Sequence, residues 1–89
     1  MAPYKVVLER KADADLAAMS PANRRRILRA IHERLTVDPA GVGKPLQHNL
    51  KGCWRLRVGE WRVLYRIDGN TVTVFVFAVA NRSDVYKRR

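Results

Sequence analysis

Basic and apolar residues alternate through residues 53–66, where the chain reads Cys-Trp-Arg-Leu-Arg-Val-Gly-Glu-Trp-Arg-Val-Leu-Tyr-Arg. A period of two is typical of a β-strand with two different faces. Gly59 and Glu60 predict a two-residue hairpin turn, because a type II′ turn prefers glycine at its first position. With this turn, one face of the hairpin carries four arginines: Arg55, Arg57, Arg62 and Arg66.

This pairing sets Arg57 directly opposite Arg62, and like charges opposite each other on a sheet are destabilising. Guanidinium groups hold phosphate through paired hydrogen bonds and stay charged at any physiological pH. The cluster therefore predicts a surface that binds a polyanion and stabilises the negative charge of a phosphoryl-transfer transition state. The alternative is a solvated basic strand face without a ligand.

Tyr86 and two histidines are further candidates. A tyrosine beside a basic surface can stack on a base or hydrogen-bond a reacting group, or it can simply anchor the tail to the sheet. Imidazole often serves as acid or base, and His48 precedes the first arginine strand, whereas His32 lies on a basic helix. The sequence has no metal-ligand spacing and no phosphate-binding loop, so we expect no metal and no cofactor.

Composition indicates one small domain, residues 1–89, with 18 Lys and Arg against 8 Asp and Glu and a net charge of +10. A domain this basic is expected to meet nucleic acid, an anionic membrane or an acidic protein. Cys53 is the single cysteine, which excludes an intrachain disulfide and fits a reducing compartment. The longest apolar run, residues 74–80, is too short to span a bilayer, and no signal peptide is visible. We therefore expect a cytoplasmic protein.

The elements that position these residues follow from periodicity and turn chemistry. The predicted strands are residues 4–9, 53–58, 61–68 and 71–80. Asp13 is expected to cap a short helix that runs to about Met19, and Ser20 followed by Pro21 predicts the start of a second helix. Pro39 is expected to end that second helix and to open a connection without secondary structure over residues 39–51.

These elements predict an α+β fold in which two N-terminal helices pack on one face of a mostly antiparallel four-stranded sheet. The last strand is apolar almost throughout and is expected at a central position. Gly69 and Asn70 predict a second tight turn. That turn would pair Arg62 with Phe77 and Leu64 with Phe75, which would place aromatic rings beside the arginines.

The chain resembles the RelE/ParE toxin superfamily through two blocks of sequence. The first comprises Gly-Lys-Pro-Leu at residues 43–46 and the segment from Leu50 to Ile67. The second is the ending Arg-Ser-Asp-Val-Tyr at residues 82–86, which is similar to the closing motif of the RelE branch. The resemblance covers nearly the whole chain, and it implies the fold described above.

The resemblance also implies an activity: RelE-type toxins enter the ribosomal A site and cut messenger RNA there. The ribose 2′-hydroxyl attacks the adjacent phosphate, so no metal is required. Matched onto this chain, the implied catalytic residues are Arg57, Arg62, Arg82 and Tyr86. The implied RNA-binding residues are Lys51, Arg55, Arg57, Arg66 and Lys87.

Two departures from the family pattern concern proton transfer. RelE proteins often carry lysines where this chain has Arg55 and Arg57, and arginine is not expected to act as a base. The family commonly has Gly-His-Arg where this chain has Ala80, Asn81 and Arg82. The general base is therefore left open between His48, a water molecule and positioning within the ribosome.

The expected partners are the ribosome, messenger RNA and an antitoxin with an acidic segment. The toxin and the antitoxin are expected to form a hetero-oligomer, and no membrane is expected as a partner. Two other functions stay open from the sequence. One is the ParE branch, whose toxins poison DNA gyrase and cleave no RNA. The other is a basic nucleic-acid-binding module without activity.

Overall fold

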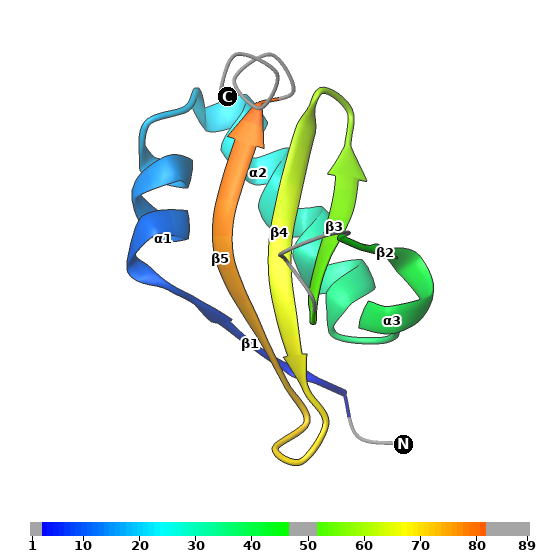
Figure 1. The fold of residues 1–89 in the computed structure, drawn as a ribbon. Helices are drawn as coiled ribbons and strands as arrows, with labels where there is room; N and C mark the ends of the chain where they lie inside the picture. Colours follow the sequence, from blue (N-terminus) through cyan, green and yellow to red (C-terminus); the bar gives the residue numbers. More distant parts are fainter. Residues whose placement is uncertain (1–2, 47–51, 82–89) are drawn as a thin grey trace.

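Helices pack on one face of a five-stranded sheet in the computed structural model, which describes residues 3–46 and 52–81 (Figure 1). The strands are β1 (Lys5–Leu8), β2 (Lys44–Pro45), β3 (Cys53–Val58), β4 (Trp61–Asp68) and β5 (Thr73–Asn81). Their order across the sheet is β1-β5-β4-β3-β2. β1 runs parallel to β5 and the other pairs are antiparallel. This confirms the predicted α+β class and the central place of the last strand, and it adds β2 as a short fifth strand.

The helical segments are α1 (Arg10–Ala17), α2 (Pro21–Ala30), the π-helix η1 (Ile31–Leu35) and α3 (Pro39–Val42). Ser20 caps α2 as predicted, because its hydroxyl accepts a hydrogen bond from the Asn23 N–H at 3.3 Å. The predicted start of the first helix is wrong. Glu9 precedes α1, and the N–H of Asp13 already donates to the Glu9 carbonyl at 2.9 Å, so Asp13 lies inside the helix.

A third helix begins where the sequence predicted an irregular connection. The Asp38 carboxylate accepts a hydrogen bond from the Gly41 N–H at 3.1 Å, and Pro39 occupies the first helical position. This capping residue followed by proline is the same start signal that opens α2. No helix in the described part of the chain is long and apolar enough to cross a membrane.

The second hairpin differs from the predicted tight turn at Gly69 and Asn70. Asp68 pairs with Thr73, so the loop contains four residues. Asp68 holds this loop, since its carboxylate accepts hydrogen bonds from the N–H groups of Asn70 at 3.0 Å and Thr71 at 3.4 Å. Such a turn formed by an aspartate side chain competes with a tight hairpin turn. The predicted register of β4 against β5 is therefore wrong.

A β-bulge changes that register again. Leu64 pairs with Ala78 but Tyr65 pairs with Val76, which leaves Phe77 as the extra residue on β5. Arg62 consequently lies opposite Ala80 instead of Phe77. The bulge keeps apolar residues on the helix side at both ends of β5.

Tyr65 is the largest side chain that is completely buried in the core. Its hydroxyl donates a hydrogen bond of 2.7 Å to the Pro39 carbonyl, which ties β4 to α3. Burial, with a smaller effect of the nearby Asp38 charge, raises the pKa of Tyr65 to about 12. Gly43 passes so close that a Cβ there would lie 1.8 Å from the Tyr65 oxygen. Only glycine therefore allows the chain to pass Tyr65 on its way into β2.

Tyr65→Phe removes this hydrogen bond and keeps the aromatic ring in the core. We expect the free energy of unfolding at pH 7 to fall by about 1 kcal/mol. The wild type should then lose stability as the pH rises from 10 towards 12, because the unfolded tyrosine ionises first. The variant has no such loss, so its stability deficit should narrow above pH 10. Urea denaturation at a series of pH values measures this, and a constant deficit would contradict it.

Candidate nucleic-acid interface

The first hairpin pairs as predicted and gathers the arginines on one face of the sheet. Val58 pairs with Trp61, Arg57 with Arg62, and Arg55 with Leu64. Gly59 opens the turn with a φ of +61°, a value that favours glycine. Leu56 and Val58 are buried towards the helices, and successive side chains of a strand point to opposite faces. The arginines therefore project from the face opposite the helices.

Lys44 adds a basic residue that sequence analysis missed. It lies on β2 directly opposite Arg55, and directly opposite residues share a face. The N–H of Leu46 donates to the Cys53 carbonyl at 2.8 Å and extends this pairing by one residue. A proline such as Pro45 is typical of an edge strand, which is the signal that could have predicted β2. We call Lys44, Arg55, Arg57 and Arg62 the basic face.

Arg66 lies on the same side of the sheet but apart from the other three arginines. It is four residues beyond Arg62, roughly 13 Å along the strand. Its guanidinium forms a 2.8 Å ion pair with Glu9 and lies 5.7 and 5.6 Å from the ring centres of Phe75 and Phe77. These contacts tie β4 across β5 to the start of α1. The role of Arg66 in RNA binding stays a prediction.

Several predicted site residues lie outside the described residues, so their predicted roles stay predictions. They are His48, Lys51, Arg82, Tyr86 and Lys87.

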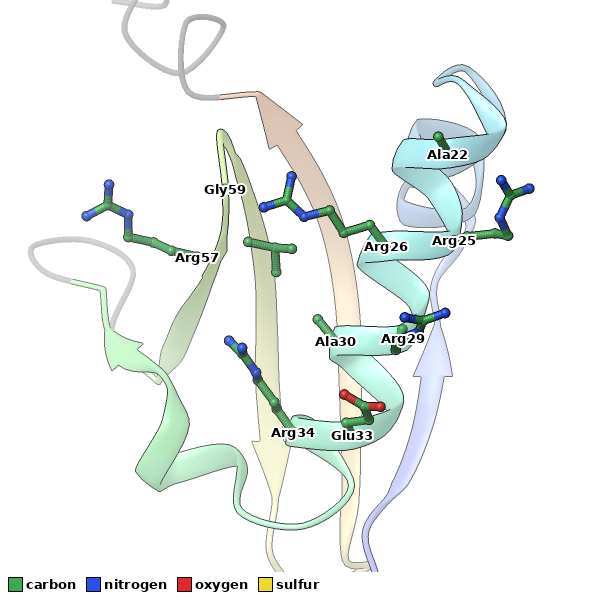
Figure 2. Close-up of a pocket in the computed structure, with 10 residues that line it drawn as sticks. Ala22, Arg25, Arg26, Arg29, Ala30, Glu33, Arg34, Arg57 and Gly59 are labelled. Carbon is green, nitrogen blue, oxygen red and sulfur yellow. The ribbon is translucent and has the colours of Figure 1, made fainter.

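A second basic region lines a groove between α2 and β3 (Figure 2). The groove has a volume of about 430 Å³, and its lining includes four helical arginines: Arg25, Arg26, Arg29 and Arg34. Figure 2 shows Arg26 and Arg34 reaching from the helix towards β3. A smaller cavity of about 150 Å³ shares Arg34 and Arg57 with the groove and adds Lys44 and Arg55. Positive charge thus continues from the basic face around β3 to the helix.

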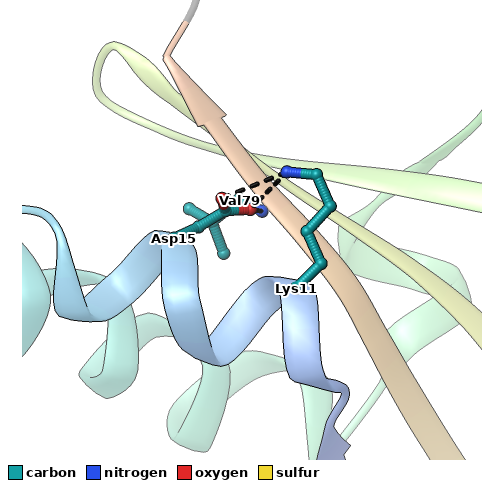
Figure 3. Close-up of polar contacts among 3 residues, drawn as sticks. All are labelled: Lys11, Asp15 and Val79. Carbon is teal, nitrogen blue, oxygen red and sulfur yellow. Dashed lines mark hydrogen bonds and ion pairs between the residues drawn. The ribbon is translucent and has the colours of Figure 1, made fainter.

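Helix α1 supports β5 beyond the point where β1 ends (Figure 3). The pairing of β1 stops at Leu8 and Val76. Further along, the Val79 N–H donates a 2.9 Å hydrogen bond to the Asp15 carboxylate, which Lys11 contacts at 3.1 Å. A side chain thereby satisfies a strand N–H that no β1 residue reaches.

Comparisons with known proteins give the family. A family model described as the ParE toxin of the type II toxin–antitoxin system parDE matches residues 6–86. The toxin RelG of Mycobacterium tuberculosis is 40% identical over 90 residues, which cover 97% of this chain and 99% of RelG. The chain belongs to the RelE/ParE toxin superfamily. The toxin RelE of the same organism is 31% identical over 85 residues, 96% of this toxin and 88% of that one.

Solved structures agree with this assignment. The toxin–antitoxin complex RelBE2 of M. tuberculosis contains a chain that superposes with a TM-score of 0.87 at 36% identity, covering 94% of this toxin and 97% of that chain. Isolated Escherichia coli RelE superposes with a TM-score of 0.73 at 20% identity, and the match covers 94% of this toxin and 92% of that chain. This similarity shows the shared fold. This protein is therefore a RelE-like type II toxin, and the plain nucleic-acid-binding module is disfavoured.

Lys44→Ala removes one charge from the basic face without touching the core, since Lys44 is exposed. We expect weaker binding of a single-stranded RNA oligonucleotide, and a plot of log affinity against log salt with a slope shallower by about 0.7. Fluorescence anisotropy over a salt series measures both. Lys5→Ala on β1, at the far edge of the sheet, is the matched control and should leave the slope almost unchanged. An equal effect of both variants would show that Lys44 contributes only to net charge.

Asp15→Ala leaves the Val79 N–H without its acceptor. We expect the free energy of unfolding to fall by about 1–3 kcal/mol, the cost of an unsatisfied buried donor. Lys11→Ala breaks only the ion pair with Asp15, so its effect should stay below about 0.5 kcal/mol. Chemical denaturation of both variants measures the difference. Equal destabilisation would show that the ion pair, and not the hydrogen bond to β5, stabilises this contact.

Proposed function

We propose that this toxin is a ribosome-dependent endoribonuclease that cuts messenger RNA in the ribosomal A site and stops translation in the cytoplasm. The observation that supports it best is the pairing of Arg57 with Arg62 on the face opposite the helices. Directly paired residues of antiparallel strands have Cα atoms roughly 4.5–5.5 Å apart. Two arginine side chains that extend from Cα atoms at that spacing on one face can reach one phosphate from two sides. A bound phosphate would offset their repulsion.

The proposed reaction is an internal transfer within the RNA. The ribose 2′-oxygen bonds to the adjacent phosphorus and the bond from phosphorus to the 5′-oxygen breaks, which leaves a 2′,3′-cyclic phosphate and a 5′-hydroxyl. The 2′-oxygen loses its proton to water, and water returns a proton to the 5′-oxygen. Negative charge grows on the phosphoryl oxygens at the transition state, where Arg57 and Arg62 stabilise it. Both arginines stay protonated throughout.

Arg55 and Lys44 are proposed to bind the neighbouring phosphates of the same strand. They form the next pair outward from Arg57 on the same face. Successive phosphates of an RNA strand each need a counter-charge, and a row of cations across three strands supplies it. Arg82 and Tyr86 are proposed to complete the site, on the strength of the family resemblance.

The proposed partner in the resting state is an antitoxin with an acidic segment. The similar M. tuberculosis structure, RelBE2, is a complex of a toxin with its antitoxin. The net charge of +10 favours an acidic partner. A toxin–antitoxin hetero-oligomer would also remove the repelling charges of the basic face from solvent.

The test is cleavage of a defined messenger RNA on programmed ribosomes. We expect Arg57→Ala and Arg62→Ala to cut at least about 100-fold more slowly than the wild type. Arg10→Ala, which removes a charge at the start of α1, should cut normally. Circular dichroism checks that each variant is folded.

Two outcomes would contradict the proposal. One is wild-type protein that leaves the message intact on ribosomes, and the other is unchanged cleavage by Arg62→Ala. Inhibition of DNA gyrase in a supercoiling assay by the same preparation would then favour the ParE-type activity.

A further inference from the structure

Two phenylalanine rings lie outside the hydrophobic core, on the face of the sheet that carries the arginines. Phe75 pairs with Arg66, and Phe77 is the extra residue of the β-bulge. Both side chains are half-buried, although phenylalanine is usually a core residue. The other aromatic residues that the structure describes belong to the core or pack against it: Tyr4, Trp54, Trp61 and Tyr65. The two outward rings therefore form an aromatic surface that the core does not use.

The Arg66 guanidinium lies over both rings and is held there from its edge. Its Cζ atom is 5.7 Å from the ring centre of Phe75 and 5.6 Å from that of Phe77, within the range of a cation–π contact. Its Nη2 atom donates a 2.8 Å hydrogen bond to Oε2 of Glu9. The Glu9 backbone is fixed as well, since its N–H donates to the Val76 carbonyl at 2.9 Å. The Arg66 side chain nevertheless stays 47% exposed, so a ligand can reach it.

The charges of this cluster favour an uncharged ligand over a phosphate. Arg66 is already paired with Glu9, and a phosphate at Arg66 would be repelled by the Glu9 carboxylate. The flat ring of a nucleobase carries no charge and meets no such repulsion. Unpaired bases stack on aromatic side chains and on arginine planes in proteins that bind single-stranded RNA.

The cluster also continues the basic face along β4. Arg62, Leu64 and Arg66 alternate on the outward side of this strand, because Val63 and Tyr65 are buried towards the helices. Arg62 carries the charge that complements an RNA phosphate, and Arg66 lies roughly 13 Å further along the same strand. An RNA strand that follows β4 from the basic face therefore reaches the two rings.

We propose that Arg66, Phe75 and Phe77 form a stacking site for one unpaired base of the RNA strand whose phosphates the basic face binds. The base stacks on the outer side of the guanidinium plane, which the two rings support from beneath. Phosphate contacts position a nucleic acid but do not read its sequence, so this site adds a contact that depends on the base. A purine has the larger ring system and should be preferred to a pyrimidine. The inference rests on the proposed function in taking RNA as the ligand of the basic face.

The test compares heptaadenylate RNA with an abasic heptamer that has the same ribose-phosphate backbone and no bases. Arg66→Lys keeps the charge but loses the plane. We expect it to weaken the binding of heptaadenylate at least about fivefold, the lower end of what one stacked base contributes, and to leave the abasic heptamer almost unchanged. Phe75→Leu and Phe77→Leu should act in the same way. Arg10→Lys, at an exposed position of α1, is the matched control and should change neither affinity.

Glu9→Gln separates the position of the guanidinium from its charge. Glu9 is a positioning residue in this inference, since it touches Arg66 and not the base. The variant raises the net charge by one, so an effect of charge alone would tighten the binding of both heptamers. A loosened guanidinium stacks less well, and the ratio of the two affinities should therefore fall. Fluorescence anisotropy of the full-length toxin with each labelled heptamer measures both affinities.

Equal effects of Arg66→Lys on the two heptamers, or no effect on either, would overturn the stacking site. Binding of the abasic heptamer by each variant shows that the variant is folded. The binding assay needs no ribosome, so its result is separate from that of the cleavage assay. Messenger cleavage by the wild type without any base-dependent effect of Arg66→Lys would refute this inference alone. A base-dependent effect without messenger cleavage would refute only the proposed enzyme.

Discussion

The burial of Val63 and Tyr65 is the constraint on which the rest of the structure depends. Both side chains of β4 are completely buried against the helices. Because side chains alternate along a strand, this burial sends Arg62 to the opposite face, and the tight turn at Gly59 then aligns Arg57 with it. A shift of one residue would bury Arg62 and expose Tyr65, at a cost far larger than the repulsion between the two arginines, of which Arg57 is exposed and Arg62 half-buried. The hydrophobic core thus holds the charges together.

Tyr65 also determines the path of the chain through α3 and into β2. Its hydrogen bond to Pro39 positions α3, and its oxygen leaves room only for glycine at Gly43. The backbone that passes it becomes β2, which sets Lys44 opposite Arg55. A core residue therefore determines where an exposed lysine lies.

β3 contributes to two basic surfaces. Its outward arginines form the basic face, and Arg57 and Val58 also line the groove beneath α2. The short β2 makes this possible, since a longer strand would pair with the edge at Arg57. Positive charge therefore lies on two neighbouring surfaces of one hairpin.

The sequence by itself determined the first hairpin, because alternation, a leading glycine and a two-residue turn all act locally and agree on one register. It also determined the fold class and the start of α2. Only the tertiary structure decided the register of β5, where Asp68 holds a wider loop and the bulge at Phe77 restores apolar packing on the helix side. The same holds for Lys44 and for the contact of Asp15 with Val79, which join residues far apart in the chain. Such placements depend on how separate elements pack, and no local pattern of residue types encodes that.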